Sequence, residues 1–319
     1  MRAIVCDRYG PPEVARVTDV PKPTIGPDEI LVHVRASSVN RTDSGARLGT
    51  PPIARLVFGL RRPKHTILGS EFAGDVVDVG IDVAEFVVGD RVFGFDDSRF
   101  GGHGEYAAYR AMGAVAKIPD GVSYETAGIA TEGAHYALGY LEAASVREGH
   151  DVLVFGATGA IGSAAVQLAV QRGARVTAVG DADKLDMVDA LGAHRAIDRT
   201  SEDFTRDEGR YHLVFDSVGK AGWQTCRHLV AEHGWFMATE FGDRFENVTA
   251  PLMTMRSAQR AAFPIPSRTR QHVKLVASLL ASGDFTPVHD RTYDMDDIVE
   301  AYRYVESGTK TGNVALRMG

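Results

Sequence analysis

Cysteine is scarce in this chain: only Cys6 and Cys226 occur among its 319 residues. The two lie far apart and no C-x-x-C pair is present, which excludes a disulfide framework and a thiolate zinc cluster of the usual spacing. So little cysteine is typical of a reducing compartment, and we expect a cytoplasmic protein. The first ten residues, MRAIVCDRYG, also lack the apolar core of a signal peptide.

The chain also lacks an excess of positive charge. Its formal net charge is −7 and its pI is about 5.9, whereas proteins that bind nucleic acid usually present a basic face. One uncharged stretch, residues 152–170, is long enough for a membrane span, but three glycines and the polar Thr158, Ser163 and Gln167 interrupt it. We therefore expect a small-molecule substrate, and neither nucleic acid nor a membrane as partner.

The length and the pattern of elements predict two domains. Short β-branched runs bounded by turn residues lie at 30–34 and 75–79 in the first third, and residues 87–93 contain the turn signal Gly89-Asp90 between strand-like flanks. These features predict an all-β unit. From about residue 123 strands and helices alternate, which predicts βαβ units and a parallel sheet covered on both faces. The expected elements there are strands at 151–156, 175–179, 213–216 and 235–239, and helices at 160–172 and 183–191. After residue 264 we expect a helix at 269–282, a short strand near Val288, a helix at 295–307 and a last strand at 313–318.

A glycine-rich turn between the first strand and first helix of this alternating part indicates a dinucleotide site. Gly159 would let the backbone approach a pyrophosphate, and Gly162 would let the helix pack closely on the strand. The helix N-terminus then offers free N–H groups to phosphates. The alternative is a purely structural turn. The residues expected to lie against the cofactor are Gly156, Ala157, Thr158, Gly159, Ala160, Ile161 and Gly162.

The end of the second strand bears on which nicotinamide cofactor is used. NAD enzymes usually place an acidic residue there for the ribose 2′-hydroxyl, whereas NADP enzymes leave space and supply a cation. Gly180 leaves space, and Lys184 and Arg199 are cations within reach, whereas Asp181 favours NAD. We expect NADPH as the cofactor, with NADH possible.

At this point several motifs, in order along nearly the whole chain, resemble the medium-chain dehydrogenase/reductase superfamily, and within it the quinone oxidoreductases. They are Val39-Asn40 with Asp43 and Arg47, Gly69–Val76 with Val79-Gly80, Gly89–Val92, the glycine turn, Leu191–Ala193 and Asp216–Gly219. The resemblance implies an α/β protein with a GroES-like, partly open β-barrel catalytic domain and a Rossmann doubly wound parallel-sheet domain. We place the first at residues 1–122, completed by 268–319, and the second at 123–267.

The resemblance also implies further cofactor contacts and an assembly. Val218, in the motif after the expected strand at 213–216, and Asn313, in the C-terminal segment, are expected to approach the cofactor. Relatives often form homodimers by joining their Rossmann sheets edge to edge. Residues 236–239 and 247–249 are the candidate edge material for a homodimer here.

Zinc-dependent relatives place a cysteine where this chain has Asn40, and a histidine–glutamate pair where it has Ser70-Glu71. Asn40 and Ser70 are poor zinc ligands, so we expect a zinc-free protein. Without a Lewis acid, reduction of an already electrophilic acceptor is favoured, because hydride can add in conjugate fashion to a quinone or an α,β-unsaturated carbonyl. Glu71, in an apolar stretch, is expected to pair with a basic residue.

Two departures from the family affect the catalytic residues. Gly45 stands where relatives often have a tyrosine, and Glu132-Gly133 stands where many have an apolar residue and a threonine. Asn40 is our candidate donor to a developing oxyanion, and Glu132 or His135 is our candidate for handling a proton. The alternatives are that Asn40 stabilises a turn, that Glu132 pairs locally and that His135 is structural.

The leading prediction is therefore an NADPH-preferring, zinc-independent quinone or enone oxidoreductase. A reductase of a specialised biosynthetic intermediate, such as an enoyl group in polyketide-like synthesis, is a second possibility within enzymes. A cofactor-binding redox sensor without turnover is a third, and the missing tyrosine is its only support.

Overall fold

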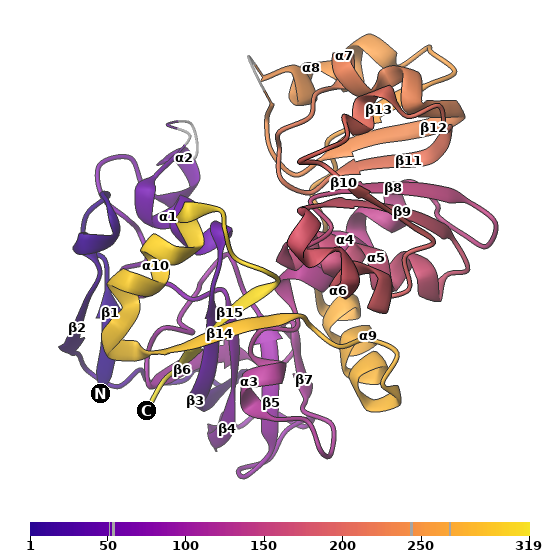
Figure 1. Cartoon of the computed structure of the whole chain (residues 1–319). Coiled ribbons are helices and arrows are strands. Elements are labelled where there is room, and N and C mark those ends of the chain that lie inside the picture. Colours follow the sequence, from indigo (N-terminus) through magenta and orange to yellow (C-terminus); the bar gives the residue numbers. More distant parts are fainter. Residues whose placement is uncertain (51, 53–54, 243–244, 268) are drawn as a thin grey trace. The chain divides into compact units, whose positions relative to one another are not determined.

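The computed structural model describes residues 1–50, 52, 55–242, 245–267 and 269–319 (Figure 1). Its chain forms two compact units: Met1–Glu132 with Thr269–Gly319, here the β-rich unit, and Gly133–Arg268, here the parallel-sheet unit. Residue 268, where we place the start of the C-terminal segment, lies outside the described residues. No helix of the described chain is long and apolar enough to cross a membrane.

The β-rich unit is built around one long strand, β3 (Glu29–Val39), which pairs with three others. Its register against β4 shifts twice, and such bulges bend a sheet toward closure. The sheet order is β14-β15-β3-β4-β5-β7, with β6 also on β3, and β1 and β2 form a separate pair. The other strands are β1 (Arg2–Val5), β2 (Arg16–Asp19), β4 (Glu71–Val79), β5 (Arg91–Phe95), β6 (Tyr106–Arg110), β7 (Val115–Lys117), β14 (His289–Asp294) and β15 (Asn313–Arg317).

The C-terminal segment completes this sheet. Figure 1 shows yellow β15 beside indigo β3, and the two pair antiparallel from Val314 opposite Val39 to Arg317 opposite Ala36. Apolar side chains on β3, such as Ile30 and Val32, are fully buried, and each such burial contributes about 1.5–3 kcal/mol. The helices are α1 (Arg41–Leu48), α2 (Arg55–Phe58), α3 (Tyr124–Ala127), α9 (Thr269–Ser282) and α10 (Ile298–Ser307).

The parallel-sheet unit has six strands in the order β10-β9-β8-β11-β12-β13, all paired in parallel. This is the 3-2-1-4-5-6 order of a doubly wound dinucleotide-binding sheet, and its topological switch point lies between β8 and β11. The strands are β8 (Asp151–Phe155), β9 (Arg175–Gly180), β10 (Arg195–Asp198), β11 (Tyr211–Asp216), β12 (Val230–Ala238) and β13 (Arg260–Ala262). The helices are α4 (Glu132–Ala143), α5 (Ala160–Gln171), α6 (Leu185–Ala190), α7 (Trp223–Cys226) and α8 (Glu246–Thr254).

Most expected elements are present, with three differences. Helix α9 has the predicted ends. The turn expected at Gly89-Asp90 lies directly before β5, but the residues before it, Val87 and Val88, are each 61% exposed and form no strand. The predicted strand at 235–239 begins earlier, at Val230, and lies inside the sheet, because β13 pairs along its outer side. The second candidate edge segment, 247–249, is helical and belongs to α8. Neither segment is therefore an edge strand.

Arg47 links α1 to the rest of the β-rich unit. Its guanidinium is fully buried, donates to the Gly10 carbonyl and to the Glu306 carboxylate on α10, and lies 4.7 Å over the Tyr302 ring. Asn40 caps the opposite end of α1 by accepting the Asp43 N–H. The side chains that α1 carries are thus held from both ends of the helix.

We predict that Arg47→Ala lowers the stability of the β-rich unit by about 3 kcal/mol, because it leaves a cavity and removes the cation from Glu306. Thermal unfolding monitored by circular dichroism measures the change. Arg303→Ala is the matched control, because Arg303 forms an exposed ion pair with Glu13 and should unfold like the wild type. Equal melting temperatures for the two variants would contradict the role given to Arg47.

Candidate active site

The glycine turn after β8 lies in close backbone contact with β9 and with the first turn of α5. Gly156 has φ +82°, a conformation that favours glycine, and its N–H and that of Ala157 donate to the Val179 carbonyl. A Cβ at Gly162 would lie 2.1 Å from the Gly156 carbonyl oxygen, so α5 can approach the strand only with glycine there. At Gly159, the N-cap of α5, a Cβ would meet only the same oxygen, at 3.5 Å. The packing of α5 on the strand therefore requires glycine at position 162, whereas position 159 has room for a Cβ.

The loop after the neighbouring strand, β11, packs against this glycine turn. Asp216 ends β11 and is buried, and its carboxylate accepts the N–H groups of Val218, Gly219 and Ala221. This loop packs Val218 on Gly156, where a Cβ would lie only 2.5 Å from Val218 Cγ1. Ligands of doubly wound sheets bind at the carboxyl ends of the strands beside such a switch point. Burial raises the pKa of Asp216 to about 6, although the backbone donors oppose the shift.

The end of β9 combines the charges that bear on cofactor choice. Arg199 and Asp181 form an ion pair of 2.5 Å, so the acidic residue is partly neutralised by the cation. A Cβ at Gly180 would lie 2.7 Å from Thr158 Cγ2, which shows that this glycine accommodates the Thr158 side chain. The open space attributed to Gly180 in the sequence is therefore used by a side chain of the protein itself. Lys184 lies in the 3-10 turn that precedes α6.

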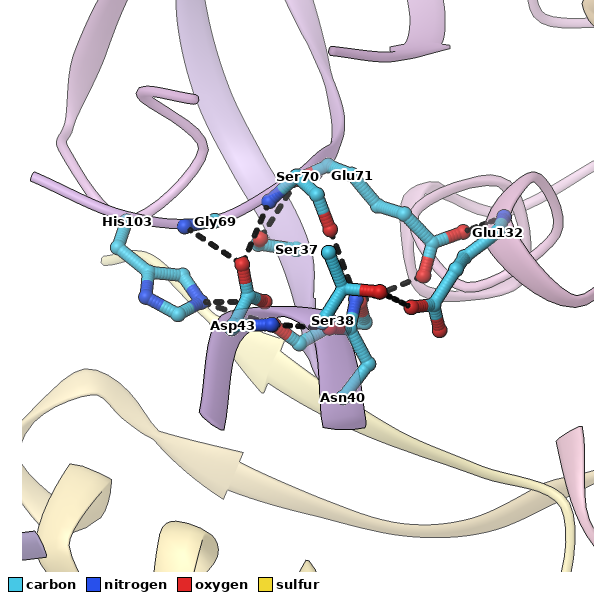
Figure 2. A network of polar contacts seen from close by, with 10 residues as sticks. Ser37, Ser38, Asn40, Asp43, Gly69, Ser70, Glu71, His103 and Glu132 are labelled. Carbon is cyan, nitrogen blue, oxygen red and sulfur yellow. Dashed lines mark hydrogen bonds and ion pairs between the residues drawn. The ribbon is translucent and has the colours of Figure 1, made fainter. Parts of the chain in front are cut away.

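In the β-rich unit, Asn40 stands at the centre of a buried polar network (Figure 2). Its Oδ1 accepts the Asp43 N–H, and its Nδ2 donates to Ser38 Oγ at 3.1 Å and to Ser70 Oγ at 2.9 Å. The amide thus has three partners within the protein, which agrees with the turn-stabilising alternative. Its donation to a substrate oxygen stays a prediction.

Glu71 is the charged centre of the network. Its side chain is 0% exposed, yet it takes part in none of the ion pairs of the described chain, so the predicted basic partner is wrong. Four donors replace the cation: Oε2 accepts Ser38 Oγ at 2.5 Å, and Oε1 accepts Thr131 N–H, Thr131 Oγ1 and Glu132 N–H at 2.7–2.8 Å. Burial raises the pKa of Glu71, and these four hydrogen bonds oppose that shift because they stabilise the ionised carboxylate.

Glu132 places a second buried carboxyl group next to Glu71, as Figure 2 shows. Its side chain is 4% exposed, and Oε1 accepts a hydrogen bond of 2.5 Å from Thr42 Oγ1. Burial, followed by the charge of Glu71, raises the pKa of Glu132 to about 8. The alternative that Glu132 pairs locally is only partly met, because its contact with Thr42 spans ninety residues.

Asp43 and His103 complete the network on its other side. Asp43 Oδ1 accepts the N–H groups of Gly69 and Ser70, and its pKa is raised well above the usual range, chiefly by burial. His103 donates from Nε2 to the Ser38 carbonyl at 2.8 Å, and burial lowers its pKa to about 4. The histidine is therefore neutral. The glycine-rich sequence around His103 gave no sign of its hydrogen bond to Ser38. Thr42 and Thr131 lie in no recognisable motif, so their hydrogen bonds to the two glutamates could not be predicted.

The remaining predicted residues are less closely tied to these groups. His135 is buried in α4 with its ring edge-on to Tyr136. Asn313 begins β15 and donates from its backbone and its side chain to the Val288 carbonyl, a structural role within the β-rich unit. Gly133 has a clear backbone function, because a Cβ there would lie 2.7 Å from the Ala160 carbonyl oxygen.

Comparison with known proteins agrees with this architecture. Residues 26–137 match the alcohol dehydrogenase GroES-like domain, and residues 191–316 match the zinc-binding dehydrogenase family. The solved quinone oxidoreductase of Coxiella burnetii superposes with a TM-score of 0.89 at 24% identity, covering 100% of this chain and 99% of that one. These matches confirm the predicted fold class, a GroES-like domain with a Rossmann-like domain.

Several curated relatives are named as reductases or oxidoreductases of quinones or enones. The 2-methylene-furan-3-one reductase of Solanum lycopersicum is 29% identical over 99% of this chain and 79% of its own length. The quinone oxidoreductase of Pseudomonas aeruginosa is 27% identical over 97% of both chains. The NADPH-dependent alkenal/one oxidoreductase of Arabidopsis thaliana is 27% identical over 99% of this chain and 79% of its own.

Fold and domain matches together define a two-domain dehydrogenase-type oxidoreductase. The chain belongs to the medium-chain dehydrogenase/reductase superfamily, with quinone oxidoreductases and enone reductases among its relatives.

Because one matched family is described as zinc-binding, the fit of this chain to zinc matters. Asn40 and Ser70 hydrogen-bond to each other, and the Glu71 carboxylate already accepts four hydrogen bonds. Amide and hydroxyl groups are also poor zinc ligands. Among the described residues, no three His, Cys, Asp or Glu side chains are grouped to hold a metal ion. The side chains at this position do not fit a zinc site.

The variant Gly159→Ala tests whether the glycine turn binds the nucleotide or serves only the fold. Gly159 has φ −83° and space for a Cβ, so we predict an unchanged melting temperature. Nucleotide affinity, measured by fluorescence titration, should fall about tenfold or more, because the methyl group stands where the pyrophosphate approaches. Gly162→Ala is the contrasting variant and should destabilise the protein by about 1–3 kcal/mol through its backbone clash. Unchanged affinity in Gly159→Ala would argue for a purely structural turn.

Proposed function

We propose that this protein is a zinc-independent, NADPH-preferring oxidoreductase that reduces a quinone or an α,β-unsaturated carbonyl compound. The observation that carries the proposal is the topological switch point between β8 and β11, where Gly159 leaves room for a Cβ at the N-terminus of α5. The named activities of the relatives support the acceptor class, since quinones and enones are both conjugated carbonyl compounds that accept hydride.

The cofactor would be held by the turn Gly156–Gly162, by Val218 and by the loop after β9. Backbone N–H groups at the start of α5 would bind the pyrophosphate, as helix N-termini do. Arg199 is the cation for a 2′-phosphate, and its ion pair with Asp181 reduces the repulsion that the acidic residue would exert. When bound, NADPH supplies the hydride. We also propose supporting roles for Gly180, Lys184 and Asn313 near the cofactor and for His135 near the reaction.

The β-rich unit supplies hydrogen-bonding groups and carboxyl groups in place of a metal ion. Conjugate reduction builds negative charge on the acceptor oxygen, and fixed donors in a dry site stabilise such charge. Asn40, although bound to Ser38 and Ser70, is the amide that we propose faces this oxygen. Both cysteines are buried thiols, which suits the reducing cytoplasm that we propose as the protein's location.

Turnover tests the proposal directly. With EDTA-treated protein, we expect NADPH absorbance to fall with quinones and enones, and to stay constant with saturated aldehydes, which lack conjugate activation. NADH should be at least about tenfold poorer, because it cannot form a charge-assisted contact with Arg199. Full activity only after added zinc would overturn the metal-free proposal. Tight NADPH binding with no turnover on the whole panel would overturn the enzymatic one.

We further propose a homodimer formed through the outer side of β13. This strand ends the sheet of the described residues, and α8 beside it exposes Leu252 by 74% and Met253 by 67%, with Met255 at its end exposed by 74%. An unpaired strand edge next to exposed apolar side chains is typical of an interface.

The double variant Leu252→Glu with Met255→Glu should shift the sedimentation equilibrium from dimer to monomer, because two charges would be buried at the interface. Ile81→Glu is the control, since Ile81 is 92% exposed on the β-rich unit and should leave the dimer intact. A wild-type protein that is monomeric at micromolar concentration would overturn the assembly.

A further inference from the structure

Two carboxyl groups meet where the chain enters α4, and they have unequal surroundings. Glu71 has four donors on its two oxygens, two from backbone N–H groups and two from hydroxyls. Glu132 has Thr42 Oγ1 as its hydrogen-bond donor. Two like charges this close in a buried site are costly, so one proton is retained by the pair. Glu71, which accepts four hydrogen bonds, carries the charge, and Glu132 carries the proton.

The other groups that face Glu132 leave this assignment in place. Asp97, after β5, adds negative charge, as does Asp43 on α1, whose own titration responds to Glu132. Lys310, before β15, and the N-terminus of α4 favour the anion. Burial and Glu71 outweigh them, and the pKa of Glu132 rises to about 8. Near neutral pH Glu132 is therefore an acid that can give up its proton.

Chain connectivity relates this acid to the glycine turn. The next residue, Gly133, approaches the Ala160 carbonyl so closely that no Cβ would fit. One peptide bond thus separates Glu132 from a residue that touches the turn for which we propose pyrophosphate binding. Gly45 on α1 has no side chain that could donate a proton, so the reduction needs an acid from another position.

We propose that Glu132 is the catalytic proton donor of this reductase and that Thr42 is its positioning residue. The inference rests on the proposed function and names the acid that function requires. An enone that has accepted hydride at its β-carbon has moved its π electrons onto the oxygen as an enolate. The Glu132 O–H bond then breaks, a C–H bond forms at the α-carbon, and the carboxylate left on Glu132 takes a proton from water.

The acceptor class provides an internal control. A reduced quinone needs protons only on oxygen, where water can deliver them, whereas an enolate needs a proton on one face of carbon. Glu132→Gln should therefore lower kcat for a 2-methyl enone by about 100-fold or more, the usual contribution of a general acid. Its kcat for a quinone should fall less than about tenfold, and its NADPH affinity should be unchanged.

The stereochemistry of protonation and the pH dependence of the rate test Glu132 as an acid, because a purely structural role of Glu132 would leave both unchanged. In deuterium oxide the wild type should place deuterium on one face of the α-carbon, and Glu132→Gln should lose this selectivity. The wild-type rate with the enone should be level below about pH 7 and should fall above about pH 8, because only the protonated acid donates. Thr42→Val should shift this limb to higher pH, since loss of its hydrogen bond disfavours the carboxylate.

Infrared spectroscopy checks the proton without turnover. The wild-type minus Glu132→Gln difference spectrum should show a protonated carboxylic acid at pH 7 that disappears above about pH 9. Glu300→Gln, at an exposed glutamate of α10, is the matched control and should behave like the wild type in every assay.

The outcomes distinguish the two proposals. A wild type that oxidises no NADPH with any acceptor would overturn the proposed function itself. A wild type that turns over, with Glu132→Gln retaining its stereoselectivity and its pH limb, would overturn the role of Glu132 alone. A carboxylate signal for Glu132 at pH 6 would do the same.

Discussion

The buried charge of Glu71 is the constraint around which the β-rich unit is arranged. A carboxylate removed from water without a cation costs several kcal/mol unless hydrogen bonds replace its hydration. Four donors meet this requirement here, and they come from β3 and from the segment Thr131–Glu132 that begins α4. Each donor group is thereby fixed in place. Ser38 in turn accepts from Asn40, so the same charge orders the N-cap of α1 and the side chains that follow it.

This constraint also explains why Glu132 differs from an ordinary helix-capping glutamate. A residue in the first turn of a helix is usually stabilised as an anion by the free N–H groups there. In α4 the N–H of Glu132 is already bound to Glu71, so the neighbouring carboxylate occupies the position that the Glu132 side chain would otherwise fill. The negative charge at this helix end is therefore supplied from β4. Glu132 is left as the acid of the pair, with Thr42 to orient it.

Much of the fold could be predicted from local sequence, because turns, periodicity and helix ends depend on residues that are close together in the chain. The glycine turn, the alternation of strands and helices and the ends of α9 depend on neighbouring residues, and the structure confirms each of them. The partners of Glu71 could not be predicted, since Ser38 and Thr131 are 33 and 60 residues away and hydroxyl donors have no distinctive spacing. The sequence also did not predict that the Thr158 side chain occupies the space at Gly180. That contact depends on tertiary packing and not on the spacing of the glycine motif.

The hydrogen bond between Asn40 and Ser70 has a consequence for the chemistry that this unit favours. Where zinc-dependent relatives would polarise a carbonyl with a cation, Asn40 and Ser70 bind each other and carry no net charge. Asp43, Glu71 and Glu132 place carboxyl groups around this pair, and negative charge on such groups opposes the build-up of an alkoxide. An enolate or hydroquinone anion spreads its charge over several atoms and is quenched by a proton. A buried acid is the group that such an intermediate needs, so the same carboxyl cluster that disfavours simple alcohol chemistry favours conjugate reduction.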